Sequence, residues 1–163
     1  CLVSLLHRCH ERGARMVLDS SGPALAATVE VGGLALIKPS HGEFRALTGL
    51  PLATPEEIAD AALALVRAGR AEMIAVTMGH EGAALATGAG TLFRRPPPVV
   101  ARSATGAGDS FVGAMTLALA EGWSHEDAFL RGMAAGSATV LNPGTGLARP
   151  EDVERLLAEL RLS

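Results

Sequence analysis

The sequence predicts an α/β protein in which short buried strands alternate with helices. Three apolar runs of strand length occupy residues 16–18, 34–37 and 73–77, and each ends in polar or glycine-containing residues. The segments between them carry apolar residues at helical spacing. Strands that alternate with helices are typical of parallel strands joined by crossovers. At 163 residues the chain suits one domain.

Start and stop signals divide the rest of the chain into helices. Thr54 followed by a proline and two acids, and Ser124 followed by a histidine and two acids, are typical N-cap signals. Gly13 ends the first expected helix, and Gly32 ends the second. The expected helices span residues 1–11, 23–31, 41–48, 55–68, 108–121, 124–141 and 150–160.

A β-hairpin is expected after the third strand. Residues 82–86 and 91–94 flank a Gly-Ala-Gly turn, which is a hairpin signal. Three prolines at 96–98 then stiffen the connection to the next segment. The sheet should therefore be parallel at its start and finish in a hairpin.

Composition excludes several classes of partner. The net charge is −3, and the aromatic residues are four Phe, one Trp and no Tyr, so neither a basic footprint nor stacking platforms for nucleic acid are present. No run reaches the roughly 20 apolar residues of a membrane span. Two cysteines make no disulfide framework, which favours a cytoplasmic protein. The chain opens on Cys1 in mid-pattern, so we expect an N-terminal part to be missing.

Polar residues follow all three expected parallel strands. They are Asp19-Ser20-Ser21, Lys38-Pro39-Ser40 and Thr77-Met78-Gly79. Ligands of such sheets collect beyond the carboxyl ends of the strands. Each polar turn alone is weak evidence, but the three together predict a common site.

The most informative stretch runs from Thr105 to Met115. Small residues at Gly106, Ala107 and Gly108 let backbone N–H groups approach an anion, and a helix that begins near Gly108 would direct its positive end to the same place. Asp109 then lies in the first turn. An N-cap is the commoner role of such an aspartate, but an N-cap does not need three small residues before it. The stretch therefore favours a phosphate site with a base beside it.

This glycine loop matches neither common nucleotide fingerprint. The P-loop needs a Gly-Lys pair, which the sequence lacks, and the dinucleotide motif needs a different glycine spacing. Asp109 would also repel a pyrophosphate. In phosphoryl transfer to a hydroxyl, however, a carboxylate at this point has a function, because the acceptor must lose its proton.

Three further features have both a functional and a structural interpretation. Lys38 could meet phosphate oxygens or could be an exposed lysine at a strand end. Glu43 could hold Mg²⁺, although on spacing alone a charge near a helix N-terminus is the better interpretation. His7, Cys9 and His10 share the first helix, but no fourth ligand follows at finger spacing, so a metal site there is not expected.

The order of these motifs resembles the PfkB (ribokinase-like) carbohydrate kinases, in particular the minor 6-phosphofructokinase branch. The matching residues are the Gly-Ala-Gly-Asp signature at 106–109 after Ser103 and Thr105, and the segments at 19–22, 38–43, 77–82, 113–117 and 134–138. The resemblance covers residues 1–163 as the ATP-binding, catalytic C-terminal part of such a kinase. It implies a three-layer α/β/α fold without the family's N-terminal half and lid.

The resemblance also implies site residues. Asp109 would be the catalytic base, and Gly106, Ala107 and Gly108 would form the anion hole. The ATP site would be lined by Lys38, Ser40, Thr77, Gly79, Gly82, Met133 and Ser137. Glu43 would act on Mg²⁺, and a monovalent cation such as K⁺ would be held, mostly through backbone carbonyls, by Ser103, Thr105, Thr139, Asn142 and Gly144. Ser40 departs from the family, which usually has Asn at this position.

The expected function is ATP-dependent phosphorylation of a sugar phosphate, with fructose 6-phosphate as the first candidate and a homodimer as the expected assembly of the whole enzyme. Fructose 1-phosphate, tagatose 6-phosphate, ribose and a nucleoside are alternative acceptors, because the family's sugar-binding residues come mainly from its N-terminal half. A non-catalytic nucleotide-binding fragment is an alternative of another class.

Overall fold

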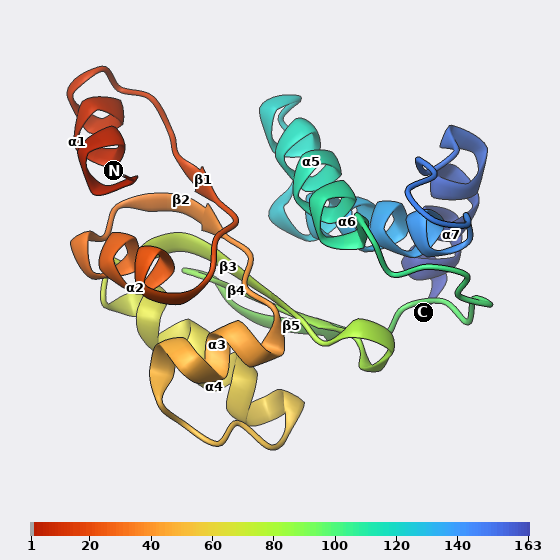
Figure 1. The fold of residues 1–163 in the computed structure, drawn as a ribbon, viewed down its shortest axis with the longest axis horizontal. Helices are drawn as coiled ribbons and strands as arrows, with labels where there is room; N and C mark the ends of the chain where they lie inside the picture. The colour runs from red at the N-terminus through yellow and green to blue at the C-terminus, as the bar shows by residue number, and fades with distance from the viewer. Residues whose placement is uncertain (1) are drawn as a thin grey trace. The chain divides into compact units, whose positions relative to one another are not determined.

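The computed structural model describes residues 2–163, and the chain divides into two compact units, residues 1–93 and 94–163 (Figure 1). The first unit holds a five-stranded sheet and four α-helices of the described chain, and the second holds three α-helices. The first contains α1 (Leu2–Glu11), β1 (Val17–Leu18), α2 (Gly22–Val31), β2 (Leu34–Ile37), α3 (His41–Thr48), α4 (Pro55–Arg67), β3 (Ala71–Thr77), the 3₁₀ turn η1 (Gly79–Glu81), β4 (Ala83–Thr87) and β5 (Gly90–Arg94).

The sheet follows chain order, β1-β2-β3-β4-β5. β1 and β2 are parallel, as are β2 and β3, and β4 returns antiparallel to β3 with Thr77 opposite Ala83. All residues of β2 and β4 are buried, the pattern of strands covered on both faces. The expected parallel start and closing hairpin are therefore confirmed, in a mixed sheet.

The helices of the first unit begin where their capping residues predict. Thr54 caps α4 by accepting a hydrogen bond from the Glu57 N–H, with Pro55 at the first position. Ser40 caps α3, and Gly49 ends that helix in the left-handed conformation with its N–H bonded to the Arg45 carbonyl. Local hydrogen bonding thus explains why α3 is only two turns long.

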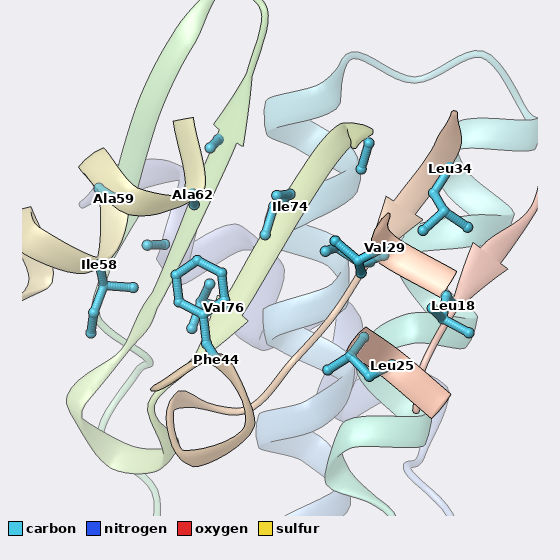
Figure 2. Close-up of a cluster of buried hydrophobic side chains, with 14 of the residues drawn as sticks. Leu18, Leu25, Val29, Leu34, Phe44, Ile58, Ala59, Ala62, Ile74 and Val76 are labelled. Carbon is cyan, nitrogen blue, oxygen red and sulfur yellow. The ribbon is translucent and has the colours of Figure 1, made fainter. Parts of the chain in front are cut away.

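One apolar core joins the helices of this unit to the sheet. Phe44 of α3 and Ile58 of α4 point toward Val76 of β3, while Leu25 and other side chains of α2 pack near β1 and β2 (Figure 2). α2, α3 and α4 lie along one face of the sheet in Figure 1. Burial of Phe44 fixes α3, whose capping residues Ser40 and Glu43 are polar.

The second unit consists of α5 (Ala107–Ala120), α6 (His125–Val140) and α7 (Pro150–Leu162). α5 and α6 pack closely because α6 has glycine where the helices meet. A Cβ at Gly132 would lie 3.0 Å from the Phe111 carbonyl oxygen, and one at Gly136 would lie 3.2 Å from that of Ala107. Phe111 and Phe129 meet edge to face across the same interface.

Trp123 lies in the turn between α5 and α6. The guanidinium groups of Arg131 and Arg161 lie 4.8 and 5.5 Å from its ring centroid.

Hydrogen bonds from the Ser124 hydroxyl and from Arg161 lower the pKa of the Asp127 carboxyl below its ordinary value. A depressed carboxyl pKa stabilises the folded state above the unfolded pKa, and this contribution is lost as pH falls.

Several boundaries differ from the sequence expectation by one or two residues. For example, β3 begins at Ala71, two residues early, and α2 begins at Gly22 rather than Pro23. The turn η1 was not expected, because its conformation depends on Gly79 and Gly82 at positive φ. Within residues 2–163, no helix combines the length and apolar character needed to cross a bilayer.

Candidate active site

The carboxyl ends of β1, β2 and β3 meet at one edge of the sheet, because the three strands are parallel. Asp19 follows β1, Lys38 follows β2 and Thr77 ends β3. An isolated parallel bridge joins Ser40 to Thr77, and the Thr77 N–H donates to the Pro39 carbonyl at 3.1 Å. The polar strand ends expected to share a site are therefore brought together in the first unit.

Lys38 is a buried cation at this edge. Its side chain is 7% exposed, and its Nζ lies 3.5 Å from Oδ1 of Asp19. The alternative of an exposed strand-end lysine is wrong, because β2 is an interior strand with β1 on one side and β3 on the other. A buried ammonium needs an anionic or polar partner, and Asp19 supplies one.

Asp19 is a residue that we did not assign from the sequence. Its signal was present, since an aspartate directly after an apolar run is one of the three polar strand ends. Only the parallel register of β1 and β2, with Leu18 opposite Ile37, shows that the residues after them are neighbours. Asp19 thus holds the Lys38 ammonium at the sheet edge.

Ser40 and Glu43 form a capping box at the start of α3. The Ser40 hydroxyl accepts from the Glu43 N–H at 3.3 Å, and Glu43 Oε2 accepts from the Ser40 N–H at 2.7 Å. The structural interpretation of Glu43 is therefore confirmed. Its other oxygen, Oε1, has no protein partner within residues 2–163. A half-buried carboxylate with one open oxygen fits a hard cation such as Mg²⁺.

His41 is held more firmly than an isolated surface histidine would be. Its Nε2 is 2.8 Å from the Leu52 carbonyl oxygen, across the loop that leads into α4. Leu52 is buried and has a positive φ of 46°, uncommon for a residue with a side chain. The bond ties this loop to the start of α3.

Gly79 and Gly82 define the loop between β3 and β4. Gly79 has a φ of 58° and Gly82 a φ of 137°, and the Met78 N–H donates to the Gly82 carbonyl. Side chains rarely adopt these conformations. Gly79 is exposed and Gly82 is buried. This tight loop keeps both glycines close to Thr77, which is also an expected ATP-site residue.

The second unit carries the glycine loop and the start of α5. Gly106 is the N-cap residue, with a φ of 79° and no side-chain cap. In the part of the chain that the structure describes, the N–H groups of Gly106, Gly108 and Asp109 donate to no protein acceptor, and Ala107 makes only a long bond of 3.4 Å to the Ala104 carbonyl. Free N–H groups at a helix N-terminus are suited to bind an anion.

Asp109 is the third residue of α5, so the N-cap alternative for it is wrong. Its side chain is exposed and has no hydrogen-bond or ion-pair partner among residues 2–163. Its carboxylate lies within one helical turn of the free N–H groups. This geometry leaves the carboxylate available to accept a proton from a bound molecule.

The remaining expected nucleotide residues lie on α6. Met133 and Ser137 are both buried, at 4% and 8% exposure, and lie one helical turn apart on the same face. Gly136 beside them allows α6 to approach the first turn of α5. The structure thus places them in the same unit as the glycine loop.

Of the five residues expected to hold a monovalent cation, Thr139 lies in the last turn of α6, and Asn142 and Gly144 follow that helix in the chain. The N–H groups of Arg102 and Ser103 donate to the Val140 carbonyl, which brings the loop before α5 to this helix end. Within the described residues, the carbonyl oxygens of Ser103, Thr105, Asn142 and Gly144 accept no hydrogen bond. Open carbonyls replace the hydration shell of K⁺ in proteins, and the negative end of a helix favours a cation. The donor set fits such an ion.

No cluster of three His, Cys, Asp or Glu side chains suited to a metal ion occurs within residues 2–163. In the first helix, His10 Nε2 lies 2.9 Å from the Gly33 carbonyl oxygen. This hydrogen bond gives His10 a role in holding the helix to the loop before β2.

Comparison with known structures identifies the fold class as ribokinase-like. The structure matches Arabidopsis thaliana ribokinase complexed with ribose and ATP, with a TM-score of 0.80 and 26% identity. The match covers 95% of this chain and 51% of the ribokinase chain. Phosphofructokinase-2 from Escherichia coli in complex with potassium matches over 98% of this chain and 52% of that one, with a TM-score of 0.94 and 40% identity.

The chain belongs to the pfkB family of carbohydrate kinases, whose family profile matches residues 1–152. It is 40% identical over 159 residues to ATP-dependent 6-phosphofructokinase isozyme 2 of Escherichia coli K12, covering 98% of this chain and 52% of that protein. It is 34% identical to 1-phosphofructokinase of Bacillus subtilis, covering 95% and 50%. The chain therefore spans about half the length of these relatives.

Proposed function

We propose that this chain provides the ATP-binding and phosphoryl-transfer machinery of a sugar-phosphate kinase that converts fructose 6-phosphate to fructose 1,6-bisphosphate. The observation that carries the proposal is the start of α5, where free backbone N–H groups adjoin an unpaired carboxylate. The family assignment and the names of the similar proteins support it. A cytoplasmic location agrees with the low cysteine content.

Each part of the start of α5 has a role in the proposed reaction. The N–H groups of Gly106, Ala107 and Gly108 would stabilise the negative charge on the transferring phosphoryl group. Asp109 would take the proton of the acceptor hydroxyl as its oxygen approaches phosphorus. The proton then resides on the Asp109 carboxyl until solvent removes it.

The residues at the sheet edge of the first unit would serve the same reaction. Lys38 would contact phosphate oxygens of ATP, since Asp19 holds its ammonium group in place and burial shields that group from solvent. Ser40, Thr77, Gly79 and Gly82 would contribute the nucleotide contacts of the first unit. For the second unit, the proposal gives adenine contacts to Met133 and Ser137. Glu43 would hold Mg²⁺ through Oε1, directly or through water, and Mg²⁺ would neutralise charge on the phosphates.

A monovalent cation would lie among the carbonyls at the end of α6. The potassium complex of the similar Escherichia coli enzyme supports this part of the proposal. Another structure of that enzyme is its tetrameric inhibited form, so assembly as a homodimer remains an expectation for the present protein.

Fructose 1-phosphate is the second candidate acceptor, because 1-phosphofructokinases are among the similar proteins. Isothermal calorimetry with Mg-ATP and a coupled assay on each sugar phosphate distinguish the possibilities. Turnover with fructose 6-phosphate supports the proposal, and faster turnover with fructose 1-phosphate favours the second acceptor. Binding of Mg-ATP without turnover of any sugar supports a non-catalytic nucleotide-binding protein, and absence of binding contradicts all of these.

Lys38→Met is expected to weaken Mg-ATP binding about 10- to 100-fold, because one charge-assisted hydrogen bond contributes roughly 1.5–3 kcal/mol. Methionine keeps the apolar stem of the side chain and removes the ammonium. Arg15→Met removes a cation from an exposed ion pair with Glu72 in the same unit and is the control. Equal affinities of the two variants for Mg-ATP would rule out phosphate binding by Lys38.

Ser40→Ala is expected to destabilise the protein by about 1 kcal/mol through loss of the α3 N-cap. Ser40→Asn keeps a good N-cap residue and introduces the residue usual in the family, so stability should be retained and Mg²⁺-dependent ATP binding should tighten. Urea unfolding measures the first effect and calorimetry at varied Mg²⁺ the second. Thr54→Ala removes the corresponding cap of α4 and is the matched control.

A further inference from the structure

Thr139 touches three separate parts of the second unit. Its carbonyl oxygen accepts from the Asn142 N–H at 3.1 Å and belongs to the group of carbonyls at the end of α6. Its hydroxyl oxygen lies 2.7 Å from the Ser110 hydroxyl in the first turns of α5. Its methyl group is 3.9 Å from the position that a Cβ of Gly106 would occupy. No other use of this hydroxyl follows from the proposed reaction.

Thr139 Oγ1 lies within hydrogen-bond distance of two groups, the Ser110 hydroxyl at 2.7 Å and the Ala135 carbonyl oxygen at 2.9 Å. The carbonyl can only accept and the threonine hydroxyl has a single proton, so both bonds form together only when Thr139 donates to Ala135 and Ser110 donates to Thr139. Thr139 is 4% exposed, so water competes poorly for these bonds. The pair joins the last turn of α6 to the residue directly after Asp109.

We propose that the Thr139–Ser110 hydrogen bond is the link through which a monovalent cation at the end of α6 orders the start of α5. A cation drawn to the carbonyls of Ser103 and Thr105 and to the end of α6 fixes the position of Thr139. Ser110 transmits that position to the first turn of α5, which carries the free N–H groups and Asp109. Both residues are positioning residues. The inference rests on the proposed function in one respect, because the nucleotide that binds at the start of α5 is taken to be Mg-ATP.

Ordering of this kind is a coupling between two ligands. A cation that orders the phosphoryl-binding N–H groups removes part of the ordering cost of nucleotide binding, so each ligand should raise the affinity for the other by the same factor. Couplings of this type are commonly about 5- to 150-fold. Because the proposed ligands are backbone carbonyls, loss of the Thr139 hydroxyl should uncouple the two sites without removing the cation ligands.

The test compares wild type with Thr139→Val, which replaces the hydroxyl by a methyl group of similar size, and with Ser110→Ala. Thr139→Ser keeps the hydroxyl and is the rescue variant. Thr28→Val is the matched control, because Thr28 is also buried and bonds to the carbonyl four residues before it, at 2.7 Å, but lies on α2 in the first unit. Mg-ATP affinity is measured by calorimetry in KCl and in choline chloride at equal ionic strength.

Wild type, Thr139→Ser and Thr28→Val are expected to bind Mg-ATP at least about fivefold more tightly in K⁺, the low end of such couplings. In Thr139→Val and Ser110→Ala this ratio should fall below about twofold, and the double variant should show no further loss. A full K⁺ effect in Thr139→Val overturns the inference, as does a wild type that binds Mg-ATP equally in both salts. Neither result affects the proposed kinase function.

Amide hydrogen exchange of residues 103–112 without nucleotide provides a second readout. K⁺ is expected to slow exchange of this segment in wild type and in Thr28→Val, and not in Thr139→Val. Equal slowing in wild type and Thr139→Val overturns the inference. If wild type binds no Mg-ATP at all, the proposed function fails, while the exchange measurement still decides whether Thr139 connects the cation to α5.

Discussion

Asp109→Asn is expected to reduce phosphorylation of fructose 6-phosphate by about 10²- to 10⁴-fold, the usual contribution of a positioned general base. Asparagine has nearly the same shape but cannot accept the proton of the acceptor hydroxyl at neutral pH. Mg-ATP affinity should not weaken, because the free N–H groups at the start of α5 remain and a nearby negative charge is removed. Steady-state kinetics measures the rate of phosphorylation, in a protein preparation whose wild type turns over fructose 6-phosphate. Calorimetry measures the affinity for Mg-ATP.

Asp60→Asn is the control for this substitution. Asp60 is an exposed aspartate on α4, and its conversion to the amide should leave kcat within about twofold, as for surface substitutions away from a site. A parallel fall in both variants would indicate a general effect of lost negative charge. If Asp109→Asn keeps the wild-type kcat, Asp109 is not the base.

Phe44→Ala is expected to lower the free energy of unfolding by about 3–5 kcal/mol, the usual cost of truncating a fully buried phenylalanine. Phe44 is 0% exposed and packs beneath α3 and α4 against the sheet (Figure 2). The cavity would remove the apolar anchor of α3, the helix that is capped by Ser40 and carries Glu43 in its first turn. We therefore also expect weaker Mg-ATP binding at temperatures close to the unfolding midpoint.

Urea unfolding followed by circular dichroism measures the loss, with Leu50→Ala as the control. Leu50 is 50% exposed in the loop after α3, so its truncation should cost less than about 1 kcal/mol. Two equal and small losses would show that the core of the first unit tolerates a cavity at Phe44.

Most of the secondary structure could be predicted because its signals are local. Ser124 caps α6 and Thr54 caps α4 through hydrogen bonds that involve residues only three positions away. Strand-length segments flanked by turns predicted all five strands, although the third was expected to begin two residues later than β3 does. The turn η1 was missed because it depends on the conformations of two glycines rather than on a periodic pattern.

The candidate site was predictable as a set of residue types and less so as a set of contacts. Lys38 was identified, but its burial and its pairing with Asp19 required the parallel register of β1 and β2. Glu43 was identified, but the structure shows that one of its oxygens already caps α3. The roles of these residues toward ATP and Mg²⁺ remain predictions for the experiments above.

By itself the sequence determined the class of the fold, the ends of most helices and the position of the glycine loop before Asp109, because caps, glycines and apolar periodicity act over a few residues. The tertiary structure decided which polar groups have partners. It paired Lys38 with Asp19 and Thr139 with Ser110, residues 19 and 29 positions apart in the chain, and it left the carboxylate of Asp109 without a partner among residues 2–163. Such pairings depend on strand register and on the close approach of α5 and α6, and no local pattern encodes either.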